Sequence, residues 1–140
     1  MEKVYDHKIQ YYETDKMQIT HHSNYIRFME EARMSFLDKH GYGYERMERE
    51  GVISPLVEIK CKYKKPTTFG DTIEIFVDTT DLTPVKLTIS YIMKVNDEIV
   101  CTGESVHCFL SRDGKVLSLK KIYPELYEIF YQMIKKNEVA

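Results

Sequence analysis

The chain has 140 residues, 43% of them hydrophobic and 30% charged, and a formal net charge of −2 at pH 7. This length is typical of one domain, here residues 1–140, with enough chain to bury a continuous core without disulfides or metals. The small negative charge argues against a nucleic-acid-binding protein, because a basic excess is needed to displace counterions from phosphates.

An odd number of cysteines, three, and the lack of a secretory hydrophobic segment predict a cytoplasmic protein with free thiols. No apolar run reaches the ~18 residues that a membrane span needs. Val4 already belongs to an alternating segment, so no targeting peptide is expected before it. His21 and His22 are adjacent, which suits one metal ion poorly, and no spaced Cys/His cluster predicts a zinc site.

The first predicted elements are a strand and a long helix. Residues 4–12 alternate between apolar and polar, which predicts a half-buried strand with Tyr11 on its apolar face. Residues 23–40 have apolar side chains at helical spacing, with Ser23 as the expected N-cap and Gly41 as the stop signal. The expected buried stripe of this helix is Tyr25, Ile26, Met29, Ala32, Phe36 and Leu37.

The middle of the chain is predicted to be mostly β. Residues 45–50 form a candidate short helix, after which the apolar period changes to two. Alternation then predicts strands at residues 57–64, from residues 73–77, at 85–95 and at 99–110.

A hairpin turn is expected at Asn96-Asp97, and a final helix is expected to start at Pro124. The apolar stripe of that helix is expected to be Leu126, Tyr127, Phe130, Tyr131 and Ile134. One strand, one long helix, four strands and a terminal helix indicate an α+β domain with an antiparallel sheet. The long helix, with its wide apolar arc, would fill the curve of that sheet.

Asp15 is a lone carboxylate in the loop between the first strand and the long helix. The loop would place it near the helix N-terminus, where unpaired N–H groups and the helix dipole favour negative charge. A carboxylate there can attack a carbonyl, or activate water to attack it, while the carbonyl oxygen becomes anionic. The alternative is an ordinary turn or cap residue, which is the commoner use of a lone Asp.

Residues 11–25 read Tyr-Tyr-Glu-Thr-Asp-Lys-Met-Gln-Ile-Thr-His-His-Ser-Asn-Tyr, and Pro66 is followed by Gly70-Asp71. On these motifs the chain resembles the hotdog-fold acyl-CoA thioesterases of the 4-hydroxybenzoyl-CoA thioesterase and Tol–Pal-associated type, over roughly residues 4–131. The resemblance implies the hotdog fold, a curved antiparallel sheet of about five strands around one long central helix, with a C-terminal helix. It also implies a homodimer or homotetramer with active sites at the dimer interface.

By this resemblance Asp15 is the catalytic carboxylate, and backbone N–H groups around His22 hold the thioester oxygen. His22 lies against the thioester, Tyr25 follows one helical turn later, and Tyr11 precedes the acid. Without the resemblance, His22 would be an exposed side chain near a cap and Tyr25 a core residue. Gln18 stands where the family usually has Gly, so a requirement for positive φ there would alter the loop or the acyl pocket.

Lysines at alternate positions 60, 62 and 64, followed by Lys65, form a basic stripe on one predicted strand. Such a stripe is most often a solvated strand face. Coenzyme A, however, carries several anionic phosphate oxygens, which makes Lys64, Lys65 and Arg112 candidates for contacts with them.

The three cysteines are expected to be small buried hydrophobic residues and not nucleophiles. Cys101 and Cys108 are separated by an odd number of positions on one predicted strand, so they should point to opposite faces. Cys61 should lie on an apolar face.

The expected function is hydrolysis of an acyl-CoA to a carboxylic acid and free coenzyme A, with no metal or other cofactor. One alternative is a thioesterase for acyl groups on acyl carrier protein, which would use the lysine stripe electrostatically. Another is a non-catalytic acyl-CoA-binding hotdog protein. The sequence leaves open the acyl group, the choice between dimer and tetramer, and the choice between nucleophile and general base for Asp15.

Overall fold

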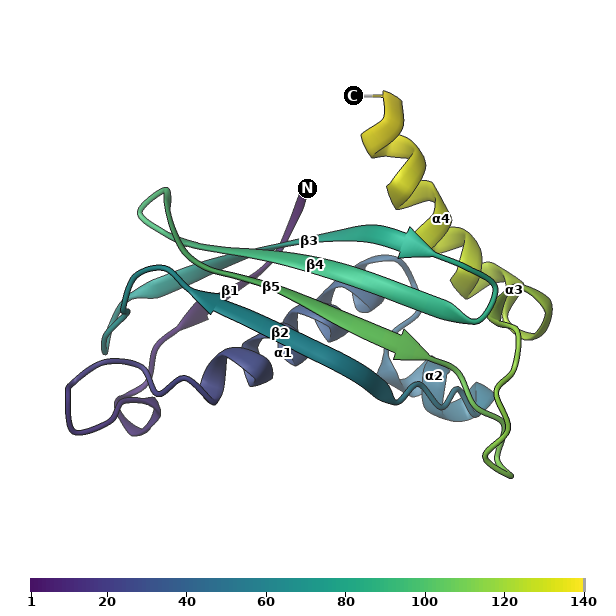
Figure 1. The fold of residues 1–140 in the computed structure, drawn as a ribbon, viewed down its shortest axis with the longest axis horizontal. Helices are drawn as coiled ribbons and strands as arrows, with labels where there is room; N and C mark the ends of the chain where they lie inside the picture. Colours follow the sequence, from purple (N-terminus) through teal and green to yellow (C-terminus); the bar gives the residue numbers. More distant parts are fainter. Residues whose placement is uncertain (140) are drawn as a thin grey trace.

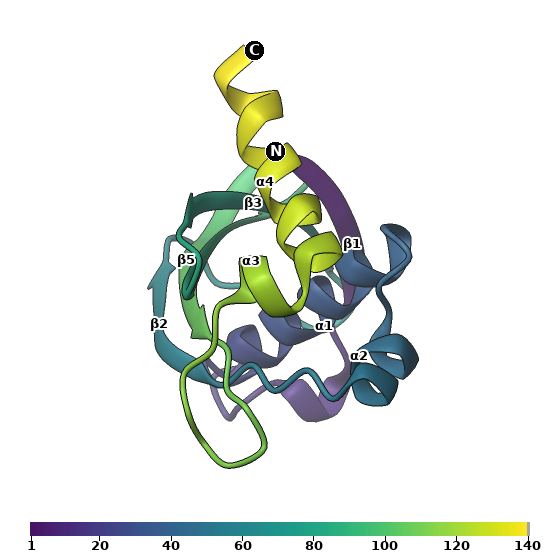
Figure 2. The ribbon, with the colours of Figure 1, turned by 90° about the vertical axis from the view of Figure 1, so that its right-hand side faces the viewer.

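The computed structural model describes residues 1–139, with side chains as far as Lys136. A five-stranded antiparallel sheet curves around one long helix, α1 (Asn24–Lys39). In Figure 1 the helix lies behind the sheet, and the end-on view of Figure 2 shows the strands as an arc around it. This is the α+β hotdog architecture that the resemblance implies.

The sheet has the strand order β1-β3-β4-β5-β2, so β1 and β2 are its two edges. The strands are β1 (Glu2–Lys8), β2 (Leu56–Tyr63), β3 (Thr72–Leu82), β4 (Lys86–Val95) and β5 (Glu98–Cys108). Asn96 and Asp97 join β4 to β5 with φ angles of 49° and 65°. Two consecutive positive φ angles are typical of the tight hairpin turn that the sequence predicts there.

The core forms where the concave face of the sheet meets α1. Alternate residues of β3, such as Ile73 and Ile75, are fully buried against it. The predicted helix stripe is wrong at one position, because Ile26 is 39% exposed whereas Phe28 is fully buried. Phe28 lies three residues after Tyr25 and therefore on the same side of the helix, whereas Ile26 is rotated toward solvent.

Strand β1 ends at Lys8, before the predicted boundary at residue 12. Residues Tyr11–Glu13 form a short 3-10 turn, η1, and Tyr11 is 78% exposed, so its predicted place on an apolar strand face is wrong. The Gln10 N–H donates to Glu13 Oε1 at 2.8 Å. This side-chain acceptor draws the backbone into a turn and away from further sheet pairing.

The remaining helices lie beyond one end of the sheet (Figure 2). Helix α2 (Tyr44–Glu50) is followed by the C-cap Gly51, whose φ is 73°, and α4 (Pro124–Val139) starts at its proline as predicted. The short helix α3 (Leu119–Ile122) was not predicted; Ser118 Oγ caps it by accepting the Lys121 N–H at 3.3 Å. Within residues 1–139 no helix is long and apolar enough to cross a membrane.

Candidate active site

Asp15 lies in the loop between η1 and α1, which closes on itself through short-range hydrogen bonds. Its N–H donates to the Ile19 carbonyl, and its own carbonyl accepts the Gln18 N–H, both at 2.9 Å. Asp15 Oδ1 accepts the Met17 N–H at 2.8 Å. Its Oδ2 has no hydrogen-bond partner among the described residues, so one carboxylate oxygen is held while the other is available to a ligand.

Asp15 opens on a cleft of about 350 Å³ between this loop, the start of α1 and the end of β2. The lining residues are Asp15, Met17, Ile19, Thr20, His22, Tyr25, Tyr63, Lys64, Lys65 and Pro66. Of the site residues predicted from the sequence, the cleft therefore brings together the acid, His22, Tyr25 and the two lysines that follow β2.

Buried Glu13 anchors the loop to its surroundings. Its carboxylate lies 2.8 Å from His7 Nε2 on β1. Its carbonyl accepts hydrogen bonds from the His21 N–H and from Asn24 Nδ2, each at 2.8 Å. Because these bonds join β1, the loop and the first residue of α1, the position of Asp15 relative to the helix is fixed.

Thr67 anchors the other side of the loop. Its Oγ1 lies 2.6 Å from Thr20 Oγ1 and 2.8 Å from the Tyr25 hydroxyl, and its carbonyl accepts the Thr20 N–H at 2.8 Å. Burial raises the pKa of Tyr25, although the hydrogen bond with Thr67 opposes this shift. Tyr25 is thus a core residue whose hydroxyl is engaged by Thr67, and it also lines the cleft.

The start of α1 differs from the prediction at Ser23. Its backbone is already helical, and its side chain makes no capping bond but lies 2.8 Å from His21 Nδ1. The Asn24 N–H donates to the His21 carbonyl at 3.0 Å, which begins the helix as a tight turn. The His22 N–H has no acceptor among the described residues, so a backbone donor at the positive end of the helix dipole is free for a ligand oxygen.

Tyr63 lines the cleft but was not among the predicted site residues. Its hydroxyl donates to the His22 carbonyl at 3.1 Å, and its ring packs edge-on against Tyr25 with a centroid distance of 5.2 Å. Burial, followed by the nearby Cys61 thiol, raises the pKa of Tyr63 to about 12, so its hydroxyl stays protonated. The available signal was the position of Tyr63 at the end of an alternating strand, directly before Lys64.

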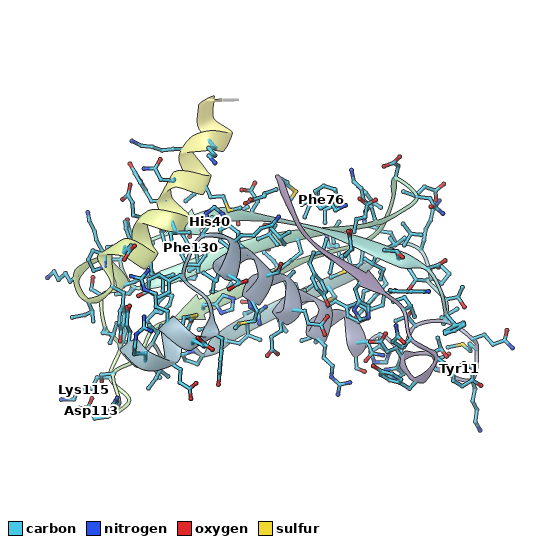
Figure 3. The ribbon with its side chains drawn as sticks, turned by 180° about the vertical axis from the view of Figure 1, so that it is seen from behind. Tyr11, His40, Phe76, Asp113, Lys115 and Phe130 are labelled. Atoms are coloured by element: carbon cyan, nitrogen blue, oxygen red, sulfur yellow. The ribbon has the colours of Figure 1, made fainter. Side chains whose placement is uncertain are left out.

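Three predicted binding residues lie outside the cleft. Tyr11 packs against Phe69 at a centroid distance of 6.0 Å, and Gln18 is exposed, with its carbonyl accepting the Thr68 hydroxyl at 2.7 Å. Arg112 belongs to a loop at the other end of the molecule. Figure 3 shows its neighbours Asp113 and Lys115 at that end and Tyr11 at the opposite one.

All three cysteines were predicted to be buried. Cys101 is buried, whereas Cys61 and Cys108 are only half-buried. The Cys101 thiol on β5 donates to the Cys61 sulfur on β2, which lowers the pKa of Cys61 to about 7. Among the side chains that the structure describes, no group of three or more His, Cys, Asp or Glu residues could hold a metal ion.

This geometry suits attack on a carbonyl carbon. Asp15, with one free carboxylate oxygen, and His22, with an unpaired N–H just before α1, line the same cleft, so a nucleophile or base and an oxyanion donor can act on one group. Lys64 and Lys65 border the cleft as well, although the Lys65 ammonium is paired with Glu98.

Comparisons with known proteins agree on one family and one fold. The family model described as the thioesterase-like superfamily matches residues 9–135. An Aquifex aeolicus protein described as a candidate esterase is 37% identical over 118 residues, covering 84% of this chain and 91% of its own. The candidate acyl-CoA thioesterase YneP of Bacillus subtilis is 31% identical over 131 residues, covering 92% and 94%. The crystal structure of the DHNA-CoA thioesterase of Staphylococcus aureus superposes with a TM-score of 0.90 at 25% identity, covering 97% and 93%.

Proposed function

The chain belongs to the thioesterase-like superfamily and is a thioester hydrolase, and we propose that it hydrolyses acyl-CoA to a carboxylic acid and free coenzyme A, with Asp15 as the nucleophile or general base. The observation that carries this proposal is that Asp15, whose Oδ2 is unpaired, and His22, whose N–H is unpaired, line the same cleft. The similarity to YneP, described as a candidate acyl-CoA thioesterase, supports coenzyme A as the thiol part of the substrate.

The His22 N–H receives the thioester oxygen as it becomes anionic during attack. A preorganised N–H donor at a helix N-terminus stabilises this charge without reorganisation. Asp15 either attacks the carbonyl carbon, which forms an acyl anhydride that water then opens, or takes a proton from an attacking water. In both routes the carbon–sulfur bond breaks and coenzyme A leaves as a thiolate, which is a good leaving group and needs no strong acid.

Lys64 and Lys65 are the residues we assign to the phosphates of coenzyme A. Both border the Asp15 cleft and both side chains are exposed, as contacts with a large polar ligand require. Acyl carrier protein remains the alternative thiol carrier, because its acidic surface would use the same lysines.

Replacement of Asp15 by Asn tests this function. Asn keeps the shape and the acceptor for the Met17 N–H but can neither attack nor remove a proton efficiently, so we expect kcat to fall by about 10³-fold. Thiol release from short-chain, long-chain and aromatic acyl-CoAs measures hydrolysis, and calorimetry with the variant measures retained binding. Asp113→Asn, at the opposite end of the molecule, is the matched control and should keep wild-type kcat.

Two results would contradict the proposal. A folded Asp15→Asn variant with nearly wild-type kcat would assign the chemistry to another residue. Wild-type hydrolysis of acyl groups on acyl carrier protein, with none of any acyl-CoA, would identify the protein-bound thioester as the substrate.

A further inference from the structure

A second depression lies between the C-terminal half of α1 and the concave face of the sheet. It is a cavity of about 200 Å³ and shares no lining residue with the Asp15 cleft. For comparison, an engineered apolar cavity of about 150 Å³ holds benzene. Most of its wall is apolar and includes Met34, Leu37, Leu87, Ile89, Phe109 and Phe130.

A buried chain of hydrogen bonds ends at this wall. Arg33 Nη1 donates to the Tyr91 hydroxyl at 3.0 Å, which lies 2.7 Å from Ser105 Oγ, and Ser105 Oγ lies 2.8 Å from His107 Nε2. Both ends of the chain, Arg33 and His107, line the cavity. Burial, and next the charge of Arg33, lower the pKa of His107 to about 4. At neutral pH the imidazole is therefore uncharged, and among these four hydrogen-bonded side chains only Arg33 carries a charge.

Arg33 has no acidic partner in the part of the chain that the structure describes. Its guanidinium makes no ion pair within 4.0 Å there, and its one hydrogen bond is to Tyr91. Glu30 and Ser54 also line the cavity, but neither makes a hydrogen bond to the Arg33 guanidinium. A guanidinium has several further N–H donors, and a half-buried cation beside apolar side chains favours an oxygen acceptor. The cavity therefore fits a ligand with an apolar body and an oxygen atom at one end.

We propose that this cavity receives the acyl group of the thioester and that Arg33 selects acyl groups with an oxygen acceptor, a carboxylate or a hydroxyl, at the end away from the thioester. This inference rests on the proposed function and names the substrate class for it. The acyl group is the part of the substrate that needs an apolar site, whereas the Asp15 cleft carries the lysines suited to coenzyme A.

A second copy of the chain connects the cleft to the cavity. Leu56, at the start of edge strand β2, lines the cavity, and Tyr63, at its end, lines the cleft. Two-fold antiparallel pairing of two β2 edges would place the Tyr63 end of one copy beside the Leu56 end of the other. Leu56, Val57 and Tyr63 are 42%, 61% and 49% exposed, so apolar side chains near both ends of this edge are available for such pairing. When Asp15 of one copy attacks the thioester, the acyl group thus extends into the cavity of the other copy.

Matched substrates and Arg33→Met test the selection. We compare kcat/KM for adipoyl-CoA with hexanoyl-CoA, and for 4-hydroxybenzoyl-CoA with benzoyl-CoA, so the two pairs separate a carboxylate from a hydroxyl. The wild type should prefer the oxygenated member of at least one pair by about tenfold or more. Arg33→Met should reduce that ratio to near one by slowing the oxygenated substrate alone, and Arg33→Lys should restore part of it.

Arg27→Met, an exposed site on the same helix, controls for the loss of a positive charge and should keep the wild-type ratio. A wild type that favours neither oxygenated substrate, or a folded Arg33→Met that keeps the preference, would overturn the assignment to Arg33. In both cases hydrolysis persists and the proposed function stands. Absence of all hydrolysis would instead count against the proposed function, and calorimetry of Asp15→Asn with adipoyl-CoA and hexanoyl-CoA would still test the cavity.

Mixing Asp15→Asn with Arg33→Met under subunit exchange tests the two-copy arrangement. A mixed dimer contains one site with intact Asp15 and intact Arg33 only if these residues come from different copies. We therefore expect selective hydrolysis of the preferred oxygenated substrate to reappear on mixing. If mixing restores no selectivity although exchange is confirmed by mass spectrometry, Asp15 and Arg33 do not act across copies.

Discussion

The backbone of Gln18 is in the left-handed region, with φ of 67°, inside the loop that carries Asp15. A residue with a Cβ atom is disfavoured there by about 1 kcal/mol or more, and glycine is not. The hydrogen bonds from the Gln18 N–H to Asp15 and from Thr68 to the Gln18 carbonyl maintain this conformation. The turn therefore stays closed with Gln18 in place of the family's glycine, and the exposed Gln18 side chain lies outside the cleft.

We expect Gln18→Gly to raise the free energy of unfolding by up to about 1 kcal/mol, because relief of the left-handed strain exceeds the added freedom of the unfolded chain. Urea denaturation measures this change. Lys16→Gly, in the same loop but with negative φ, should lower stability by about 0.5–1 kcal/mol. Equal losses in the two variants would contradict the strain at Gln18.

Residues of the candidate site were predictable where they share one short motif. Asp15, His22 and Tyr25 lie within a single strand–loop–helix segment, and the resemblance to the hotdog thioesterases marks His22 and Tyr25 as site residues within it. Tyr63 reaches the same cleft only through the pairing of β2 with β5, which local spacing does not contain. Arg112 lies at the other end of the same copy, outside the cleft, and its charge carried no information about the end of the sheet on which it lies.

At the scale of elements, the close approach of α1 to the sheet depends on Gly103 in β5. A Cβ atom added there would lie 2.1 Å from Met29 Cε and 2.8 Å from the Lys60 carbonyl oxygen. Met29 is fully buried, and the Lys60 carbonyl belongs to β2, which is paired to β5 at this point. The Lys60 carbonyl cannot move away without disturbing the pairing of the two strands, and the flexible end of Met29 can move only by repacking the core around it.

Gly103→Ala should therefore lower the free energy of unfolding by about 1–3 kcal/mol, the usual range for overpacking a core. Thermal and urea unfolding would measure the loss. Gly43→Ala is the matched control, because its added Cβ would meet the exposed side-chain tip of Asp38, which can rotate away. If both substitutions change stability to the same small extent, the helix does not depend on the absence of a side chain at Gly103.

Elements with strong periodicity were predictable, and element ends were less so. Alternation predicts β4 and the Asn96-Asp97 turn because one face of the strand is buried and the turn residues tolerate positive φ. The end of β1 was wrong because Glu13, a residue beyond the strand, supplies the hydrogen bond that turns the backbone. Capping by a later side chain is not visible in the alternation itself.

At the scale of the whole molecule, His107 makes the free energy of unfolding depend on pH, because it is buried in the series of hydrogen bonds between α1 and the sheet. Its pKa is lowered to about 4 in the folded protein, first by burial and then by Arg33. The unfolded chain binds this proton near pH 6.5. Between these two values the unfolded state takes up more protons than the folded state, so acidification favours unfolding.

The free energy of unfolding should consequently fall as the pH drops from about 6.5 to about 4, with up to about 3 kcal/mol attributable to His107. His107→Gln keeps a hydrogen-bonding group for Ser105 but cannot be protonated, so it should lose less stability over the same interval. Carboxylates titrate in both proteins, and the difference between their urea-derived stability curves isolates the histidine. Parallel curves for wild type and variant from pH 7 to pH 4 would mean that His107 is protonated as readily in the folded protein as in the unfolded chain. Burial and the charge of Arg33 would then not keep a second positive charge from His107.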